Sequence, residues 1–434
     1  MTLQFLKRKK YLIIFSTLFF SILQQNIAQE SMQLSLEQAQ TYALQHNRTL
    51  KNASFDIKKA EAEKWSTIAT LLPQVNGTFD YANMMGYKLE MMGFNIAMPP
   101  YSTIGVTTSL TFSAGQFIGI KIHNIARDMA DISLKQTEQQ ILNKVKTVYF
   151  SILVMNETVL LLDSNLNNMR TLQEHTENSV KVGILNQTEA DKISVQIASV
   201  ENSVNSVKRA LEMLYNAMRL QLGLDIDAQI QLTQKIEDII NVSEAEKLLN
   251  INFQPENNYS YKLLQSSVNL SKQQLNLKKW AYAPTLTAFH SYSKKEYFSD
   301  EPTMNMTPPN ILGVSINVPI FSSGSKFASV KAANLEYKKQ LNNLTDAKDG
   351  LAIQYRQLSY NLKTAIEAYE AQKKNIKVNK QVFEDVSRMY AQGMASVLDI
   401  TNAGSNLISA QSSYVQTMMD IVSAQIAIEE LINN

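Results

Sequence analysis

Two long stretches without proline constrain this chain more than any other feature of its sequence. Proline is absent from 101–254 and from 320–434, whereas 9 prolines occur elsewhere. A proline inside a helix removes a hydrogen bond and clashes with the preceding turn, so both stretches are free to be helical. The helical pattern from 115 to 182 alone corresponds to about 100 Å of helix. Helices of globular domains average about 11–12 residues, so the sequence predicts an elongated helical structure.

The first stretch carries a heptad seam, in which mostly apolar residues alternate by four and three positions. The seam comprises Ile141, Val145, Val148, Ile152, Met155, Val159, Leu162, Leu166 and Met169. This spacing is the a/d pattern of coiled coils. A shift of 210 residues keeps the register in the second stretch and also relates Gly183 to Gly393. The shifted positions are Leu351, Tyr355, Leu358, Leu362, Ala365, Tyr369, Gln372, Ile376 and Asn379. The sequence therefore predicts an internal duplication with two similar halves.

Residues 1–28 are typical of a secretory signal peptide, because four basic residues at 7–10 precede an apolar core at 11–23. An uncleaved N-terminal anchor is the alternative. The chain has 0 cysteines, which excludes disulfides, thiolate ligands and a lipid on an N-terminal cysteine. No run of 18 apolar residues follows residue 28, so we expect no transmembrane helix. An exported chain of this kind is either soluble or part of a membrane β-barrel.

Each half also contains a pair of segments with a period of two. In 104–112 the even positions are apolar except for Thr108 and the odd positions are small or polar, and 312–320 shows a similar alternation. The alternation predicts strands with one apolar face. Two ordinary hairpins on a soluble core remain the alternative. The signal peptide and the long helices favour strands of an outer-membrane barrel, which need about nine to eleven residues.

Four strands cannot close a useful barrel, and an open sheet edge is not tolerated in lipid. The barrel interpretation therefore demands that several chains pool their hairpins. Two chains would give about eight strands with a filled interior, and three would give about twelve strands with room for a passage.

The predicted fold is mainly α with a small β part, in two tandem repeats of helix, β-hairpin, long helix, turn and helix. The first repeat, 29–223, is expected to contain strands at about 75–83 and 103–113, a long helix over 116–182 and a helix over 187–223. The second repeat, 258–434, is expected to contain strands at about 285–293 and 311–321, a long helix over 325–392 and a helix over 397–432. An equatorial segment, 224–257, connects them. Ser35 and Gln38 form a predicted capping box at the first helix.

With this order of elements the chain resembles the outer-membrane efflux channel family, the TolC-like proteins. The most specific local features are the Phe-x-x-Gly strand ends, at 112–115 and 321–324, and the turn glycines Gly183 and Gly393. The resemblance implies a homotrimer with a helical tunnel in the periplasm, capped by a 12-stranded transmembrane barrel in outer-membrane lipid. It also implies a periplasmic adaptor protein and an inner-membrane pump as partners.

The resemblance also implies roles for residues of the two glycine turns, which in the family form a gated periplasmic entrance. Asp399 matches an aspartate that rings the pore and binds cations, and Asn402 stands where a second aspartate occurs. Tyr390 matches a gate tyrosine, and Glu189 matches an acid that this tyrosine bonds. Thr188 also matches, whereas Ala395 replaces an arginine. Gly183 and Gly393 would lie where the adaptor docks.

The residues themselves support a second interpretation of these turns. Asn186 with Glu189, and Ser396 with Asp399, have the spacing of a capping box. A carboxylate in the first turn of a helix is favoured by the helix dipole without any pore. Glycine is also common just past a helix end. Capping and pore lining are compatible, and both stay open at this point.

The sequence shows no motif for chemical catalysis or for cofactor binding. The 4 histidines, at positions 46, 123, 175 and 290, lack metal-ligand spacing. Phosphate loops, nucleophile elbows and zinc-protease signatures are absent. The net charge of +2 gives no indication of nucleic-acid binding. We therefore expect a passive channel for efflux or type I secretion, without cofactor or metal. The alternative is a soluble periplasmic coiled-coil scaffold or adaptor.

Overall fold

The computed structural model describes residues 32–91, 94–236, 241–299, 305 and 307–433. Its contacts divide the chain into two compact units. The helical unit comprises Met1–Asn47, Ile141–Leu249 and Asn361–Ile426, and the sheet unit comprises Arg48–Gln140, Asn250–Tyr360 and Ala427–Asn434. Each unit takes segments from both halves of the sequence. The repeat is therefore a unit of sequence and not a unit of packing. The predicted signal peptide lies outside the described residues.

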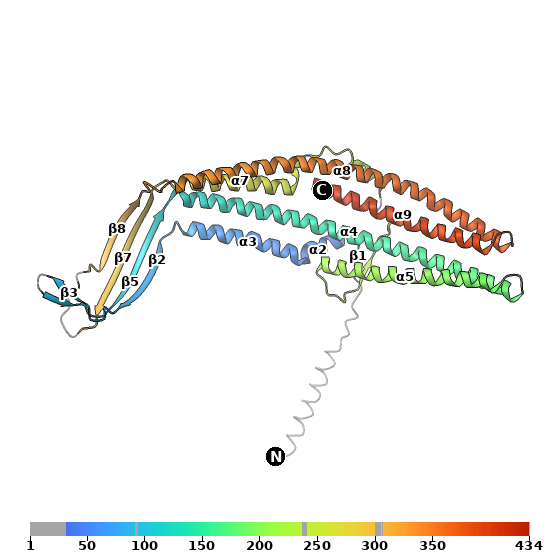
Figure 1. Ribbon diagram of the computed structural model, residues 1–434, viewed down its shortest axis with the longest axis horizontal. Coiled ribbons are helices and arrows are strands. Elements are labelled where there is room, and N and C mark those ends of the chain that lie inside the picture. Colours follow the sequence, from blue (N-terminus) through green and yellow to red (C-terminus); the bar gives the residue numbers. More distant parts are fainter. Residues whose placement is uncertain (1–31, 92–93, 237–240, 300–304, 306, 434) are drawn as a thin grey trace, which may run out of the picture. The chain divides into compact units, whose positions relative to one another are not determined.

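A four-stranded antiparallel sheet forms the β part of the sheet unit, in the order β2-β5-β7-β8 (Figure 1). The strands are β2 (Gln74–Ala82), β5 (Tyr101–Phe112), β7 (Thr285–Tyr297) and β8 (Asn310–Asn317). The long strands β5 and β7 pair along the whole of β5 and join the two hairpins. The sheet therefore has two open edges, β2 and β8.

The register of this sheet places the apolar side chains on one face. Phe79 lies opposite Ile104, and Leu286 lies opposite Ile316. These side chains are exposed in the single chain, where Phe79 retains 70% of its surface. Directly opposed residues share a face of an antiparallel pair, so the predicted period of two is confirmed.

The other face of the sheet carries small and polar residues that bond across the strands. The hydroxyls of Thr107 and Ser291 lie 3.0 Å apart, and those of Thr111 and Thr287 lie 3.1 Å apart. The two faces therefore differ in chemistry over the part of the β5–β7 pair nearest the helices, from Val106 to Phe112. One face can meet hydrocarbon, whereas the other suits water.

The structure corrects two predicted strand ends and adds one hairpin that was not predicted. Strand β7 extends to Tyr297, beyond the predicted 293, because its charged end still pairs with β5. Strand β8 ends at Asn317, before the predicted 321, since Pro319 has no amide to donate to the ladder. The predicted loop between β2 and β5 contains a small hairpin of its own, β3 (Lys88–Met91) with β4 (Phe94–Ala97).

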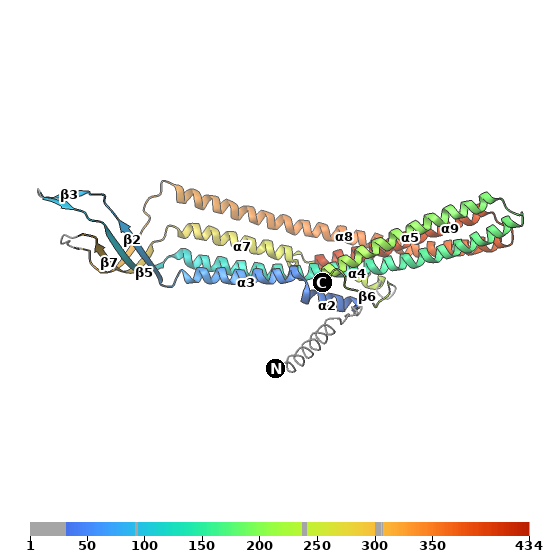
Figure 2. The same ribbon diagram turned by 90° about the horizontal axis from the view of Figure 1, so that it is seen from below.

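Four helices continue the four strands within the sheet unit. Helix α3 (Arg48–Ala69) precedes β2, α4 (Ala114–Lys181) follows β5, α7 (Tyr259–Trp280) precedes β7, and α8 (Ser325–Ala391) follows β8. Near the sheet these helices lie side by side in the order of the strands (Figure 2). Helices that are attached to neighbouring strands are therefore themselves neighbours, and the four helix ends next to the sheet form one row.

The helical unit contains two antiparallel helical hairpins. The end of α4 pairs with α5 (Gln187–Leu222), and the end of α8 pairs with α9 (Val397–Ile432), apart from the last residues of α9. Every position of both heptad seams is buried or half-buried, in agreement with the prediction. The seams therefore contribute to the packing of these helices, because helix stability in proteins comes chiefly from a buried apolar stripe.

A short parallel ladder ties the start of the described chain to the segment between the repeats. Strand β1 (Met32–Leu34) pairs with β6 (Ile230–Leu232), and the Tyr149 hydroxyl donates to Leu34 O at 3.0 Å. The predicted capping box of Ser35 is present at the start of α2 (Leu36–His46). The ladder was not predicted, because strands of three residues carry no readable periodicity.

Two further short helices complete the described segment between the repeats. Helix α6 (Val242–Leu248) belongs to the helical unit, and the 3-10 helix η2 (Pro255–Asn257) belongs to the sheet unit. In the sheet unit, Lys348 of α8 pairs with Glu256 of η2 at 2.7 Å. Each end of the connection is thus attached to its own unit.

Helix α4 is apolar enough to meet a simple criterion for a membrane span. Its best 18-residue window has a mean hydropathy of 1.5, and 39% of that window is buried within the chain. By length and composition alone, α4 therefore does not agree with the expectation that no segment after residue 28 could span a membrane. The heptad seam accounts for much of this hydropathy, since α4 is the helix that carries the first seam.

Candidate functional site

Two glycine turns in the helical unit have the same backbone. Gly183 has φ of +80° and Gly393 has φ of +73°, a region that side chains disfavour. In the first turn the amide of Ile184 donates to Ser179 O at 2.9 Å, and in the second the amide of Met394 donates to Met389 O at 2.9 Å. This is the Schellman arrangement, which satisfies carbonyls left free at a helix end. The predicted local role of both glycines is confirmed.

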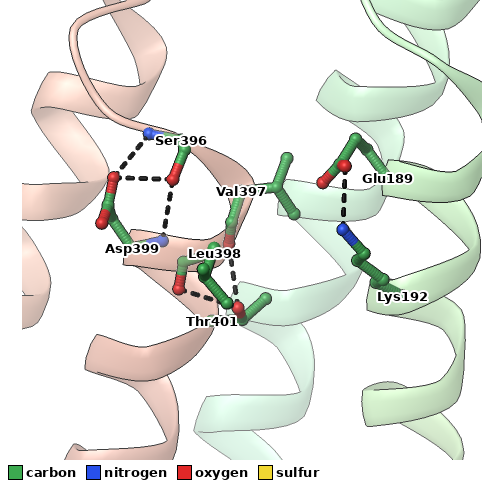
Figure 3. A network of polar contacts seen from close by, with 7 residues as sticks. All are labelled: Glu189, Lys192, Ser396, Val397, Leu398, Asp399 and Thr401. Atoms are coloured by element: carbon green, nitrogen blue, oxygen red, sulfur yellow. Dashed lines mark hydrogen bonds and ion pairs between the residues drawn. The ribbon is translucent and has the colours of Figure 1, made fainter.

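Asp399 caps the start of α9 in the second turn (Figure 3). Its Oδ2 accepts from the Ser396 amide at 2.8 Å and from the Ser396 hydroxyl at 2.7 Å. In return the Asp399 amide donates to Ser396 Oγ at 3.2 Å. The two donors of Ser396 hold the pKa of Asp399 below its usual range. The carboxylate is therefore ionised at neutral pH, and the capping interpretation of this turn is confirmed.

Glu189 occupies the corresponding position of the first turn but does not cap its helix. The side chain of Asn186 makes no capping bond, so the expected box is not formed there. Glu189 Oε1 instead accepts from Lys192 Nζ at 2.9 Å, one turn along α5 (Figure 3). The negative charge is thus paired locally. The two acids related by the duplication have different partners.

Val397 lies between these two acids and anchors the second turn. Its side chain is 3% exposed and packs into a core formed by α4 and α5, which includes Leu166 and Ile193. In Figure 3 it separates the Asp399 cap from the Glu189–Lys192 pair. The corresponding residue of the first turn, Gln187, is exposed. At this pair of equivalent positions the second turn therefore places a buried side chain in a core of the other hairpin, whereas the first turn has an exposed one.

Tyr390 forms a bond that the sequence did not predict. Its hydroxyl lies 2.6 Å from the hydroxyl of Thr176, which is fully buried on α4. The implied bond between Tyr390 and Glu189 is therefore absent within this described chain, because Thr176 takes the tyrosine and Lys192 takes the acid. Thr176 lies seven residues after Met169, so an extension of the heptad seam would have identified it as a buried position.

An open cavity of about 1330 Å³ lies among α4, α5, α8 and α9 of the helical unit. Tyr390 and Gly393 contribute to its wall near the second turn, and His175 and Lys380 contribute charged or polar groups. Of the predicted site residues Tyr390 and Gly393 line this cavity, whereas Asp399, Glu189, Thr188 and Asn402 are not among its lining residues.

Comparison with known proteins decides the family. The family model for outer membrane efflux proteins matches residues 25–224 and 256–434, which is most of the chain. The chain belongs to this family. Two TolC outer membrane proteins are 20% identical to it: that of Escherichia coli over 90% of this chain and 82% of the relative, and that of Salmonella enteritidis over 87% and 77%. The fold resembles that of the outer membrane protein VceC of Vibrio cholerae, with a TM-score of 0.74, 14% identity and coverage of 92% of this chain and 96% of that one.

This outer membrane efflux protein is therefore an outer-membrane channel of efflux systems, and its helical body lies in the periplasm. The two matched ranges fall on the two repeats and leave out most of the segment between them. A scaffold or adaptor is not favoured. Proteins of this family perform transport, which agrees with the expectation of a channel.

The other two predicted gate residues of the efflux protein, Thr188 and Asn402, have exposed side chains. Neither side chain makes a hydrogen bond within the described part of the chain. In the described ranges no group of three or more His, Cys, Asp or Glu side chains is arranged to hold a metal ion. The two turns therefore present carboxylates, hydroxyl groups and one packed valine.

Proposed function

We propose that three copies of this efflux protein form a passive conduit from the periplasm to the exterior, with a twelve-stranded barrel in outer-membrane lipid. The observation that carries the proposal is the sheet with one exposed apolar face and two open edges. In lipid every backbone group needs a partner, so the edges β2 and β8 have to pair with other copies.

The strand directions allow such pairing around a closed ring. All three ladders of the four-stranded sheet are antiparallel, so its edge strands β2 and β8 run in opposite directions. Strand β8 of one copy can then pair antiparallel with β2 of the next, as in barrels of even strand number. Two copies would give about eight strands and a filled interior, whereas three give about twelve and a passage.

The glycine turns form the proposed gated entrance. Each places a carboxylate in the first turn of a helix, and a threefold assembly would repeat Asp399 and Glu189 around one axis. Shared negative potential in a narrow bore favours cations. Tyr390, Thr188 and Asn402 lie on the same two hairpins and would shape the constriction. Ala395 replaces an expected arginine, which removes one polar contact from closure.

The turn tips are the proposed docking site for a periplasmic adaptor, which would connect an inner-membrane pump. Ile184 and Met394 follow the two turn glycines and are 75% and 62% exposed. Apolar side chains at a tip suit a protein partner, because their burial there is favourable. Energy for transport would come from the pump, so the channel itself needs neither nucleotide nor cofactor.

Planar-bilayer conductance tests the conduit and the constriction together. We expect discrete small steps from the detergent-purified mature protein, with block by trivalent cations that Asp399→Asn relieves. Asp420→Asn is the matched control, since Asp420 is an exposed carboxylate farther along α9. Block that survives Asp399→Asn would leave Asp399 with a capping role only. A protein that never inserts and stays soluble without detergent would contradict the membrane sheet.

Cysteine cross-linking tests the number of copies, and the native chain has 0 cysteines to interfere. Asn76→Cys on β2 combined with Ser315→Cys on β8 should give a ladder that ends at three chains after treatment with a short bis-maleimide. Ser109→Cys with Ser315→Cys is the control, because β5 is an inner strand. A ladder that ends at two chains would contradict the trimer.

A further inference from the structure

The row of helix ends that meets the sheet is strongly basic. We consider the eleven residues of each end nearest the sheet: 62–72, 114–124, 273–283 and 325–335. They contain six lysines, and Glu63 is their one acidic residue. The lysines are Lys64, Lys121, Lys278, Lys279, Lys326 and Lys331. The whole chain is nearly neutral, with 41 basic and 39 acidic residues, so this excess is local.

The same helix ends expose large aromatic side chains. Trp65 is 61% exposed, Phe117 54%, Trp280 53%, Tyr282 48% and Phe327 70%. We call these aromatic residues and the six lysines the lysine–aromatic collar. Trp65 and Trp280 are the 2 tryptophans of the entire chain. Aromatic residues with an apolar ring and a polar edge concentrate at the boundary between membrane and water.

Direct contacts make the collar one continuous surface of the sheet unit. The Gln116 amide of α4 donates to Thr70 O after α3 at 3.1 Å. A side chain at Gly115 of α4 would lie 3.4 Å from Leu277 of α7, so these two helices are in contact. Lys326 Nζ of α8 donates to Ala281 O after α7 at 2.8 Å. The collar therefore follows the strand order across the whole sheet.

The collar lysines have no acidic partners in the described ranges, since none of the six forms an ion pair with a carboxylate. Four of them, Lys121, Lys278, Lys279 and Lys331, are exposed. Lys326 lies 5.4 Å from the ring centre of Tyr282, which keeps its charge beside an aromatic face. The positive charge is thus available to an external anion.

The opposite end of the sheet has a different charge pattern. Its described strands carry three lysines and three acids: Lys88, Lys294, Lys295, Asp80, Glu90 and Glu296. Lys295 there lies 3.6 Å from the ring centre of Tyr101. Basic charge without compensation is therefore a property of the helix end of the sheet and not of the sheet as a whole.

We propose that the lysine–aromatic collar binds the phosphate headgroups of anionic phospholipids in the leaflet where the helices meet the sheet. The inference rests on the proposed position of the sheet in the membrane. Lysines extend their charged ends to the headgroup level while their methylene chains follow apolar surface. Anionic headgroups attract such lysines over about one Debye length, so the attraction weakens with salt.

Tryptophan fluorescence tests the proposal on the full mature protein, because both tryptophans lie in the collar. The protein is reconstituted in phosphatidylcholine vesicles that contain one of two brominated lipids. The first is brominated phosphatidylglycerol and the second is brominated phosphatidylcholine, and both carry bromine near the headgroup end of the acyl chains. We expect brominated phosphatidylglycerol to quench at roughly ten-fold lower mole fraction than brominated phosphatidylcholine. High salt should reduce this difference in the wild type. The salt titration thus tests the electrostatic attraction between lysines and headgroups without any variant.

The test variant is Lys278→Gln with Lys279→Gln and Lys331→Gln, which keeps both tryptophans and the Lys326 bond. Its preference for phosphatidylglycerol should fall to about two-fold or less. The matched control is Lys363→Gln with Lys373→Gln and Lys374→Gln, which removes the same charge from exposed sites of α8 in the helical unit. The control should keep the wild-type preference.

Conductance of the same vesicle samples separates failure of this proposal from failure of the channel. If both brominated lipids quench equally while conductance is present, the collar lies at the membrane but does not prefer anionic phospholipids, and the proposal is overturned. Conductance without quenching would place the collar outside lipid and overturn the proposal. Loss of the preference on addition of inorganic phosphate would assign the site to free phosphate instead. Absence of both signals would overturn the proposed membrane sheet as well.

Discussion

The two glycine turns share one backbone and differ in what their side chains contact. Both satisfy their helix ends through a glycine of positive φ. In the second turn Asp399 is bonded within a closed capping box and Val397 is buried. In the first, Glu189 pairs along its own helix and Gln187 is exposed. The two turns therefore share their backbone geometry but differ in the burial of the equivalent residues Val397 and Gln187.

Val397→Ala should have the largest effect on this asymmetry. Val397 is 3% exposed, so truncation loses apolar contacts and leaves a cavity, with a cost of about 2 kcal/mol. Hydrogen exchange of amides at the start of α9 should rise by about 5- to 30-fold. Gln187→Ala in the first turn is the control and should stay within about 0.5 kcal/mol. Equal effects would show that the turns are packed alike.

Gly183→Ala and Gly393→Ala should have equal effects of about 1–2 kcal/mol each. The cost comes from the left-handed backbone, since nothing lies within 4 Å of the added Cβ at either site. Gly223→Ala is the reference, because its Cβ would lie 2.6 Å from His46 O and should cost more. Local hydrogen exchange measures each turn. Unequal values for Gly183 and Gly393 would contradict the shared geometry.

Tyr390→Phe should destabilise the contact of α8 with α4 by about 1 kcal/mol. It removes the hydroxyl that lies 2.6 Å from Thr176 and leaves the aromatic ring in place. Thr176 keeps its own bond to Leu172 O at 2.9 Å, so it is not left without an acceptor. A double-mutant cycle with Thr176→Val measures the coupling by thermal unfolding. Additive effects of the two substitutions would show that the Tyr390–Thr176 hydrogen bond does not contribute to stability.

Ser396→Ala should have a smaller effect on stability than these core and turn substitutions, at about 0.5–1 kcal/mol, through loss of the cap. Asn186→Ala should cost less, because Asn186 makes no side-chain capping bond. Hydrogen exchange at the starts of α5 and α9 compares the two. A larger loss of stability with Asn186→Ala than with Ser396→Ala would contradict the conclusion that only the second of these two residues caps its helix.

The same Ser396→Ala substitution should change the acid response of the channel. The pKa of Asp399 is lowered by Ser396, so its contribution to stability is full above the unfolded pKa of about 3.9 and is lost as pH falls through the lowered value. Removal of Ser396 should move the midpoint of acid loss of cation selectivity upward. The measurement is conductance selectivity as a function of pH. An unchanged midpoint would show that Asp399 does not face the permeating ions.

Periodic features of this molecule were predictable, because they depend on local geometry. The heptad seams and the alternation of Ile104 and Val106 were readable from spacing alone. The ends of β7 and β8 were not, since they depend on which strand offers a partner and where Pro319 interrupts the ladder. The Tyr390–Thr176 bond was missed for the same reason, because it joins α8 to α4 over 214 residues of sequence.

The sequence by itself determined the duplication, the order of elements and the left-handed turns at Gly183 and Gly393. These follow from proline placement, apolar period and backbone sterics, all of which act within a few residues. Only the tertiary structure decided that Val397 is buried while the equivalent Gln187 is exposed, and that the compact units cut across the repeats. Val397 packs against residues of α4 and α5 that lie far from it in the sequence, and no local pattern specifies such a contact.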